Sequence, residues 1–217
     1  MIHGLRIAIE GNIGVGKSSL LPRLREQLCG EWEVMDERAD EDPEFKELLS
    51  SFNKDPNKQA QFQSWITQRR LREFQSLAQN PVHYLFERSF LGELVFCHAN
   101  FMRHEKPNGQ FMGYYYNIVA ALKQCRYDAV VYLKASPEKC FERIRYRSRK
   151  EENTINFEYV RHLHACYETH LTESARVLNI PVLTVDWENF GSADIVCEQI
   201  LAIVDLAKPG AEKAALF

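Results

Sequence analysis

A glycine-rich segment near the start of the chain has the residue types and the spacing of a phosphate-binding loop. Residues 11–18 fit the P-loop pattern GxxxxGK(S/T). In such a loop successive backbone N–H groups point at one anion, and the positive end of the following helix strengthens the attraction. The residues expected to hold a nucleoside triphosphate are Gly11, Asn12, Ile13, Gly14, Val15, Gly16, Lys17, Ser18 and Ser19. Lys17 would reach the β- and γ-phosphates, and the Ser18 hydroxyl would bind Mg²⁺.

Other motifs separate the enzyme classes that share this loop. GTPases carry DxxG and NKxD motifs, and the sequence contains neither. Large ATPases carry an apolar strand that ends in Asp-Asp or Asp-Glu, whereas the apolar run at residues 82–86 ends in Glu87-Arg88-Ser89. We therefore expect a kinase that acts on a small molecule.

A second group of cations lies in the C-terminal half of the chain. Five of eight consecutive residues are basic: Arg143, Arg145, Arg147, Arg149 and Lys150. A spacing of four predicts Arg143 and Arg147 on one helical face, and Arg145 and Arg149 on another. Alone, this pattern also fits a solvated helix end. Beside a P-loop, it predicts a mobile lid whose guanidinium groups stabilise a phosphoryl group during transfer.

Short apolar runs alternate with helical patterns along the chain. The runs at residues 5–9, 32–35, 82–86, 129–133 and 182–185 are apolar over nearly their whole length. Such runs are typical of strands that are buried on both faces, as in a parallel sheet. Strands that alternate with long crossovers predict a doubly wound α/β domain.

Helix starts are marked by a capping side chain before a proline, at Asp42-Pro43, Asp55-Pro56 and Ser136-Pro137. Residues 59–79 and 156–177 predict two long helices without interruption. Because we find no linker, we expect a single domain over residues 1–207, with the lid at about 143–154 and a tail at 208–217.

The composition narrows the possible partners. The 217 residues carry a net charge of −3, so no overall basic field favours a nucleic-acid polymer. The six cysteines form no CxxC pair, which predicts reduced thiols packed as small apolar side chains. We find no targeting signal, and the apolar runs are shorter than the ~20 residues that span a bilayer. These features predict a cytoplasmic protein without a membrane partner.

Taken together, the motifs resemble the deoxynucleoside kinase family, which includes deoxycytidine, deoxyguanosine and deoxyadenosine kinases and herpesvirus-type thymidine kinases. The matching pieces follow the family's order at residues 10–19, 32–37, 62–65, 86–89, 131–138 and 143–152. The resemblance implies a five-stranded parallel sheet with flanking helices, in a homodimer. It also implies transfer of the γ-phosphate of ATP, or of another nucleoside triphosphate, to the 5′-hydroxyl of a deoxynucleoside in the presence of Mg²⁺.

The same resemblance assigns roles at the reacting centre. Glu37 corresponds to the carboxylate beside the 5′-hydroxyl. Glu87 corresponds to the carboxylate near the metal, which is often assigned as the base. Arg88 corresponds to the arginine that contacts the 5′-oxygen and the phosphoryl group. The residues alone leave open which of the two carboxylates is the base.

The resemblance also assigns residues to the base and sugar of the nucleoside and to the adenine and triphosphate of ATP. Gln63 corresponds to the glutamine that pairs with the base edge, and Glu152 to the lid glutamate that holds the sugar 3′-hydroxyl. Residues 186–190, including Asn189 and Phe190, fall where the adenine of ATP is bound. The arginines expected to contact the triphosphate are Arg143, Arg147 and Arg149.

Physical reasoning supports a carboxylate beside the acceptor independently. A 5′-hydroxyl is a poor nucleophile, so a carboxylate within ~3 Å is needed to accept its proton. Glu37 lies in an acidic stretch at residues 36–44, where like charges would raise its pKa if it is partly buried. Without the resemblance, this stretch also fits a solvated loop and helix start.

Two positions bear on the choice of base. Arg70 and Glu93 match sites where family members carry a charged pair that faces the base, and members with small or apolar residues there tend to accept thymidine. We therefore expect deoxycytidine or a purine deoxynucleoside to be favoured over thymidine. Arg70 could also be a surface arginine of the long helix. The family tyrosine before Lys54 is absent, and Asn53 could donate to a sugar hydroxyl instead.

Two alternatives remain from the sequence. A nucleoside monophosphate kinase shares the P-loop, an acidic-Arg motif and the arginine lid, but it needs extra cations where residues 36–47 are acidic. A catalytically silent subunit with this fold, like the kinase-related accessory subunit of respiratory complex I, has no need to retain Lys17, Glu37 and Arg88 together.

Overall fold

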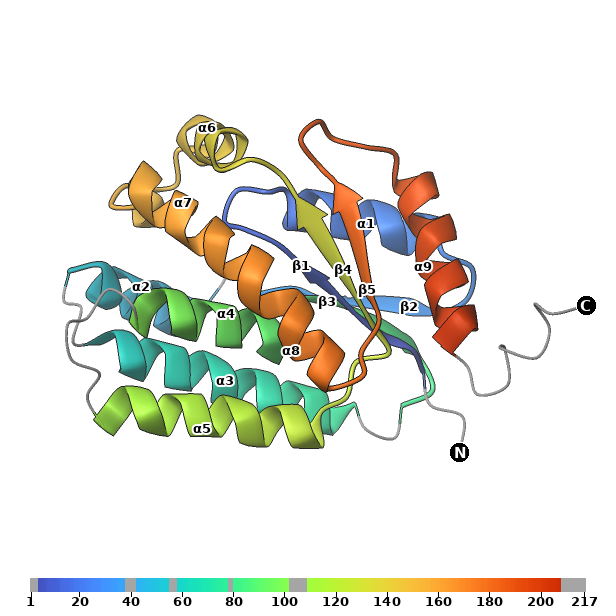
Figure 1. Cartoon of the computed structure of the whole chain (residues 1–217), viewed down its shortest axis with the longest axis horizontal. Helices are drawn as coiled ribbons and strands as arrows, with labels where there is room; N and C mark the ends of the chain where they lie inside the picture. The colour runs from blue at the N-terminus through green and yellow to red at the C-terminus, as the bar shows by residue number, and fades with distance from the viewer. Residues whose placement is uncertain (1–3, 38–41, 55–57, 78–79, 102–108, 208–217) are drawn as a thin grey trace, which may run out of the picture.

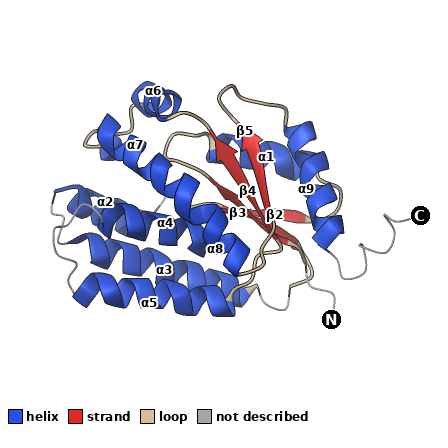
Figure 2. Cartoon of the chain, viewed as in Figure 1, coloured by secondary structure: helices blue, strands red, loops and turns tan. Residues whose placement is uncertain are grey.

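The computed structural model of the chain describes residues 4–37, 42–54, 58–77, 80–101 and 109–207. One sheet of five parallel strands, in the order β2-β3-β1-β4-β5, runs through its centre (Figure 2). The strands are β1 (Arg6–Glu10), β2 (Trp32–Met35), β3 (His83–Glu87), β4 (Ala129–Lys134) and β5 (Val182–Asp186). The predicted sheet is confirmed, and each apolar run lies within one residue of a strand.

Helices pack on both faces of this sheet (Figure 1). On one face lie α1 (Lys17–Gln27) and α9 (Ala193–Ala207). The other face is covered by α3 (Gln59–Ser76), α4 (Phe90–Phe101), α5 (Gly109–Gln124), α7 (Phe157–Cys166) and α8 (Thr172–Val177). The remaining helices follow the carboxyl ends of strands: α2 (Pro43–Lys54) comes after β2, and α6 (Pro137–Arg147) with the 3₁₀-helix η2 (Lys150–Glu152) comes after β4.

The two layers explain why the central strands are largely apolar. Ile7 and Ile9 of β1 pack in the core on the side of α1 and α9, whereas Ala8 packs in the core on the opposite side. Because successive side chains of a strand point to opposite faces, a strand covered on both faces needs apolar residues at every position. All three residues are completely buried.

Two of the predicted helix starts are confirmed. The Asp42 carboxylate accepts hydrogen bonds from the backbone N–H groups of Glu44 and Phe45, at 2.9 and 3.1 Å. The Ser136 hydroxyl accepts one from the backbone N–H of Lys139 at 3.2 Å. These side chains satisfy N–H groups that have no partner within the helix. The third start, Asp55-Pro56, lies outside the described residues.

The helices differ from the prediction at two places. Residues 156–177 do not form one regular helix, because the π-helix η3 (Tyr167–Leu171) lies between α7 and α8. In the lid, α6 ends at Arg147, and Ser148 has a left-handed φ of 53°. Arg149 therefore leaves the helix, and the prediction that Arg145 and Arg149 share a helical face is wrong.

The core contains most of the cysteines, as predicted. The buried thiols, none in a disulfide, are Cys97, Cys125, Cys140, Cys166 and Cys197, whereas Cys29 is exposed. Within the described ranges, no helix combines the length and the apolar content that crossing a membrane requires. The predicted tail at 208–217 lies outside these ranges.

Candidate active site

The phosphate-binding loop joins β1 to α1 at the edge where the parallel strands end. Gly14 has a φ of 78°, and a Cβ there would lie 2.4 Å from the carbonyl oxygen of Cys140, so only glycine fits without strain. Lys17 Nζ is buried inside the loop and donates to the carbonyl oxygens of Gly11 at 3.2 Å and Asn12 at 3.1 Å. Burial, together with the charge of nearby Arg88, lowers the pKa of Lys17 to about 8.

A hydroxyl and a carboxylate meet beside the loop. Ser18 Oγ donates to Glu87 Oε1 at 2.8 Å, which joins the start of α1 to the end of β3. Both are hard oxygen donors of the type that Mg²⁺ takes, and Mg²⁺ usually uses one or two protein oxygens beside substrate phosphates. Ser18 and Glu87 therefore fit the metal. In the described part of the chain, no group of three or more His, Cys, Asp or Glu side chains could hold a metal ion.

Glu37, which follows β2, lies between two arginines. Its Oε1 is 3.2 Å from Arg88 Nε and 3.4 Å from Arg70 Nη2. Burial disfavours the charged carboxylate, but Arg88 and Arg70 outweigh this effect, and the pKa of Glu37 is lowered. The expectation that neighbouring acidic residues raise this pKa is therefore wrong. The charges that lower the pKa belong to Arg88 and Arg70, which are distant from Glu37 in the sequence.

A second charged pair lies deeper between α3 and α4. Arg70 Nε is 3.2 Å from Glu93 Oε1, and both side chains are buried, so Arg70 is not a surface arginine. Thr67 donates a hydrogen bond to the other Glu93 oxygen. Burial raises the pKa of Glu93 to about 7, against the opposing effects of Arg70 and Thr67. Apart from this ion pair, Arg70 Nη1 and Glu93 Oε1 make no hydrogen bond within the described residues.

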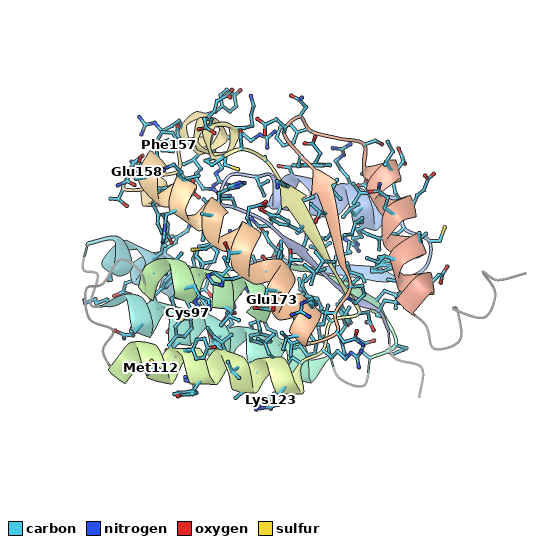
Figure 3. All side chains as sticks on the ribbon, in the orientation of Figure 1. Cys97, Met112, Lys123, Phe157, Glu158 and Glu173 are labelled. Atoms are coloured by element: carbon cyan, nitrogen blue, oxygen red, sulfur yellow. The ribbon has the colours of Figure 1, made fainter. Side chains whose placement is uncertain are left out.

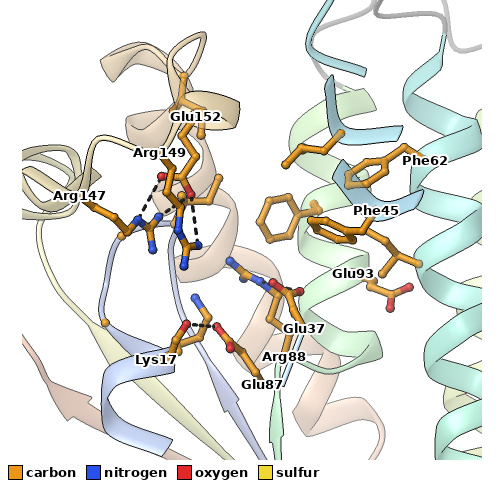
Figure 4. A pocket seen from close by; sticks show the side chains of 18 of the residues that line it. Lys17, Glu37, Phe45, Phe62, Glu87, Arg88, Glu93, Arg147, Arg149 and Glu152 are labelled. Atoms are coloured by element: carbon orange, nitrogen blue, oxygen red, sulfur yellow. Dashed lines mark hydrogen bonds and ion pairs between the residues drawn. The ribbon is translucent and has the colours of Figure 1, made fainter. Parts of the chain in front are cut away.

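One cavity of about 260 Å³ is lined by the charged and hydroxyl side chains of Lys17, Ser18, Glu37, Arg70, Glu87, Arg88 and Glu93 (Figure 4). Lys17 and Glu87 lie at one end, and Glu37 and Arg88 lie in the middle. Glu93 lies at the far end, together with aromatic side chains. The cavity thus offers, in order, a phosphate-binding end, a paired acid and cation, and a mixed polar and apolar end.

The far end has both apolar walls and an oriented amide. Phe45 of α2 and Phe62 of α3 line it and meet edge to face, with ring centroids 5.5 Å apart. Gln63 is buried, and its Oε1 accepts a hydrogen bond from the Tyr114 hydroxyl at 3.2 Å. Phe96 lies under Arg88, with the guanidinium carbon 4.7 Å from the ring centroid. A planar, polar-edged ligand suits this lining.

The lid lies over the phosphate end (Figure 4). Arg147 holds Glu152 with two hydrogen bonds, of 2.5 and 3.2 Å, and Arg149 Nη1 lies 4.0 Å from the same carboxylate. All three side chains line the cavity. Arg147 and Arg149 thus flank one carboxylate, although only Arg147 belongs to α6.

A second cavity, of about 450 Å³, lies on the other side of the loop and is lined by Gly14, Gly16, Arg143, Asn189 and Phe190 among others. Arg143 donates to the carbonyl oxygens of Val15 at 2.9 Å, Trp187 at 3.2 Å and Glu188 at 2.9 Å. Its guanidinium carbon lies 4.1 Å from the centroid of the Phe190 ring. Arg143 therefore fastens the loop to the segment after β5.

Comparison with known proteins assigns the chain to a family. Residues 7–206 match the family described as deoxynucleoside kinase. The chain belongs to the deoxynucleoside kinase family. Deoxycytidine kinase 2 of Gallus gallus is 31% identical to this kinase over 218 residues, covering 83% of this chain and 81% of the relative. Human deoxycytidine kinase is 30% identical, covering 83% of each chain. Mitochondrial deoxyguanosine kinase of Xenopus laevis is 28% identical, covering 87% and 84%.

The fold of this deoxynucleoside kinase is also found among solved structures. The structure of deoxyadenosine kinase from M. mycoides with bound dATP superposes with a TM-score of 0.75. The match covers 91% of this chain and 99% of the other. Because the two sequences are only 24% identical, this match supports the fold alone.

Not every residue predicted for the kinase site lines a cavity. Asn12 Nδ2 donates to the carbonyl of Val160 at 3.0 Å, and Val15 is completely buried, so both brace the loop from behind. Gly11 lies beside them, where its carbonyl oxygen accepts from Lys17. Asn53 belongs to α2, but its side chain lies outside those that the structure describes.

Several residues around the predicted site residues were not predicted from the sequence, among them Tyr114 beside Gln63 and Phe96 beside Arg88. Thr67 bonds to Glu93, and Tyr167 and Glu10 form a hydrogen-bonded chain with Arg88. Glu10 leaves a signal, since it is an acidic residue directly after an apolar strand and before the glycine loop. Tyr167 continues the regular backbone of α7, and an aromatic residue on the apolar face of a helix is interpreted as core packing.

Proposed function

We propose that this deoxynucleoside kinase transfers the γ-phosphate of ATP, or of another nucleoside triphosphate, to the 5′-hydroxyl of its substrate. We further propose that it favours deoxycytidine or a purine deoxynucleoside over thymidine. One observation carries the proposal: a single cavity leads from Lys17, past the Glu37–Arg88 ion pair, to the buried Arg70–Glu93 pair.

The phosphate end would hold the donor. The backbone N–H groups of the loop and the Lys17 ammonium attract the triphosphate, and Arg147 and Arg149 reach it from the lid. Mg²⁺ would be held by Ser18 and Glu87, and when bound it supplies positive charge against the phosphate oxygens. Asn189 and Phe190 line the second cavity, where they would hold the base of the donor.

In the middle of the cavity, Glu37 would accept the proton of the 5′-hydroxyl. Its lowered pKa keeps it ionised at neutral pH, and only an ionised carboxylate accepts a proton. Glu87 Oε1 already accepts a hydrogen bond from Ser18, which favours a role at the metal for Glu87. Arg88, 3.2 Å from Glu37, would stabilise the charge of the phosphoryl group in transfer.

At the far end, Arg70 Nη1 and Glu93 Oε1 supply one donor and one acceptor to the base edge. Arg70 Nη1 is buried without a hydrogen-bond partner among the described residues, and Glu93 Oε1 contacts only the Arg70 guanidinium, so a base that bonds to both satisfies a buried polar group. A pair of this kind rejects analogues that leave it unpaired, by factors of up to about 10⁴. Gln63 would bind the same edge, Phe45 and Phe62 would pack on the ring, and Glu152 would hold the 3′-hydroxyl.

Turnover with a panel of substrates tests the proposal. With ATP and Mg²⁺, we expect phosphorylation of deoxycytidine, deoxyadenosine or deoxyguanosine, little with thymidine, and none with the corresponding monophosphates. Turnover of monophosphates alone would instead indicate a nucleoside monophosphate kinase. No transfer to any nucleoside by correctly folded protein would indicate a silent subunit.

The predicted homodimer also belongs to this proposal. The family resemblance is its basis, and the surface of α5 is compatible with it, because Met112 and Tyr116 are exposed one turn apart (Figure 3 labels Met112). Light scattering after size-exclusion chromatography tests it, and a monomeric mass at micromolar concentration would contradict it. The cytoplasmic location remains a prediction from the sequence.

A further inference from the structure

A hydrogen-bonded chain runs from Arg88 into the interior of the protein. Arg88 Nη1 donates to the Tyr167 hydroxyl at 2.8 Å, and this hydroxyl donates to Glu10 Oε2 at 3.1 Å. Glu10 and Tyr167 are completely buried. Because a phenol has one proton, its hydroxyl must accept from the guanidinium if it donates to the carboxylate. The chain therefore has one direction, from the cation to the buried anion.

The other oxygen of Glu10 holds the backbone next to Arg88. Glu10 Oε1 accepts hydrogen bonds from the backbone N–H of Ser89 at 2.6 Å, the Ser89 hydroxyl at 2.7 Å and the backbone N–H of Gly92 at 3.2 Å. These donors lie at the N-terminus of α4, where a negative charge is favoured. Arg88 itself has a left-handed φ of 68°, which is uncommon for arginine and needs support from its surroundings.

The ring of Tyr167 has little freedom to turn its hydroxyl away. It stacks on Tyr132 with the centroids 5.7 Å apart and an angle of 8° between the planes. Phe96 meets it edge to face at 6.3 Å. Tyr167 is also the first residue of the π-helix η3, and π-turns within helices are frequent at functional sites. The helix geometry and the ring packing together fix where the hydroxyl lies.

From these contacts we infer that Glu10 and Tyr167 are positioning residues, which hold Arg88 in place for phosphoryl transfer. One carboxylate fixes Arg88 twice, at the backbone through Ser89 and at the guanidinium through Tyr167. A cation that is already oriented stabilises developing charge without reorganising at the moment of reaction. The inference rests on the role proposed for Arg88 in the reaction.

Tyr167→Phe tests the inference, because it removes the hydroxyl and leaves the ring. Tyr132→Phe is the matched control, since its hydroxyl bonds to Glu168 at 2.7 Å and makes no bond to Arg88. We expect Tyr167→Phe to lower the single-turnover rate of phosphoryl transfer about tenfold, because small displacements of a reacting group are costly. The nucleoside KM should stay within about twofold in both variants, because neither tyrosine lines the cavity. The rate of Tyr132→Phe should also stay within about twofold of wild type, because this change removes no hydrogen bond of Arg88.

Arg88→Gln separates this inference from the proposed function. If Arg88→Gln keeps the wild-type rate, the role proposed for Arg88 is wrong. If Arg88→Gln is impaired but Tyr167→Phe behaves like Tyr132→Phe, only the positioning role is wrong. In the Arg88→Gln background, adding Tyr167→Phe should cause no further loss, and fully additive losses would overturn the inference.

A second variant guards against a folding defect in Tyr167→Phe. Glu10→Gln keeps the side-chain shape but replaces one acceptor oxygen by an N–H donor, so the Tyr167 hydroxyl can no longer donate to it. We expect a reduced transfer rate with the nucleoside KM within about twofold of wild type. A wild-type rate in folded Glu10→Gln protein, with an unchanged thermal midpoint, would overturn the inference.

Discussion

The carboxylate of Glu37 lies 3.2 Å from the guanidinium of Arg88, and this ion pair occupies the middle of the cavity. It brings together the end of β2 and the end of β3, which are neighbouring strands in the sheet. The pairing keeps Glu37 ionised, so the groups that titrate near neutral pH must lie elsewhere in the site.

Glu93 is the carboxyl group that should control the pH dependence of substrate binding. Its pKa is raised to about 7, so it becomes protonated as the pH falls through 7 and loses an acceptor for the base. At saturating ATP, we expect kcat/KM for the nucleoside to fall below pH 7. Between pH 7 and 6, kcat should stay nearly constant, because Glu37 remains ionised and Lys17, with a pKa of about 8, remains protonated. Glu93→Gln should remove the inflection. An inflection that persists in this variant would assign it to another group.

Lys17→Ala should impair catalysis without impairing folding. The change removes a cation that attracts phosphate, but the loop is also braced by Asn12, Val15 and Arg143. We expect kcat to fall by about 10²–10³-fold, which is typical for the loss of one group that stabilises the transition state. Circular dichroism and the thermal midpoint should remain close to wild type. A near-normal kcat would refute the assignment of the loop.

Two arginines of α6 should give opposite phenotypes. Arg143 bonds to three backbone carbonyl groups, so Arg143→Ala should cost roughly 2 kcal/mol of stability. For a chain of this size, that loss lowers the thermal midpoint by roughly 4–8 °C. Arg147→Ala loses only a partly exposed ion pair with Glu152, so its midpoint should barely change. Its kcat should nevertheless fall about 10²-fold. Equal effects of the two changes on stability and rate would contradict this division.

The Arg70–Glu93 pair should determine which base is accepted. Replacing both partners avoids leaving the buried Glu93 carboxylate without its cation, which Arg70→Met alone would do. We expect the Arg70→Met, Glu93→Ala double variant to gain activity with thymidine and to lose at least about tenfold in kcat/KM with its best natural nucleoside. Ratios of kcat/KM measured on the two substrates check this. An unchanged ratio would mean that the pair does not face the base.

Much of the framework was predictable because it depends on local patterns. The strands are apolar at successive positions since helices cover both faces, and Asp42 and Ser136 cap helices that begin with proline. The P-loop is set by glycines at fixed spacing. The charged pair of Arg70 and Glu93 came from the family resemblance, and the structure places the two side chains in contact.

The remaining features depend on contacts between distant segments. The pKa of Glu37 is lowered by Arg88 and Arg70, which are far from it in the chain. The acidic stretch around Glu37 therefore predicted a shift of this pKa in the wrong direction. The π-helix that begins at Tyr167 has no local signature, because residues 157–177 are compatible with a regular helix. Arg149 lies outside α6, because Ser148 adopts a left-handed conformation that ends the helix. A glycine at this position would have marked the helix end in the sequence, but the residue is serine.

The central claim is that the acceptor is the 5′-hydroxyl, held between Glu37 and the phosphate-binding loop. In the most direct test, the enzyme is incubated with ATP, Mg²⁺ and either the best nucleoside of the panel or its 5′-deoxy analogue. The products are then identified by ³¹P nuclear magnetic resonance. The parent nucleoside should yield ADP and the nucleoside 5′-monophosphate in equal amounts. The analogue should bind but remain unphosphorylated. A phosphate on the 3′-oxygen, or a phosphorylated 5′-deoxy analogue, would contradict this account.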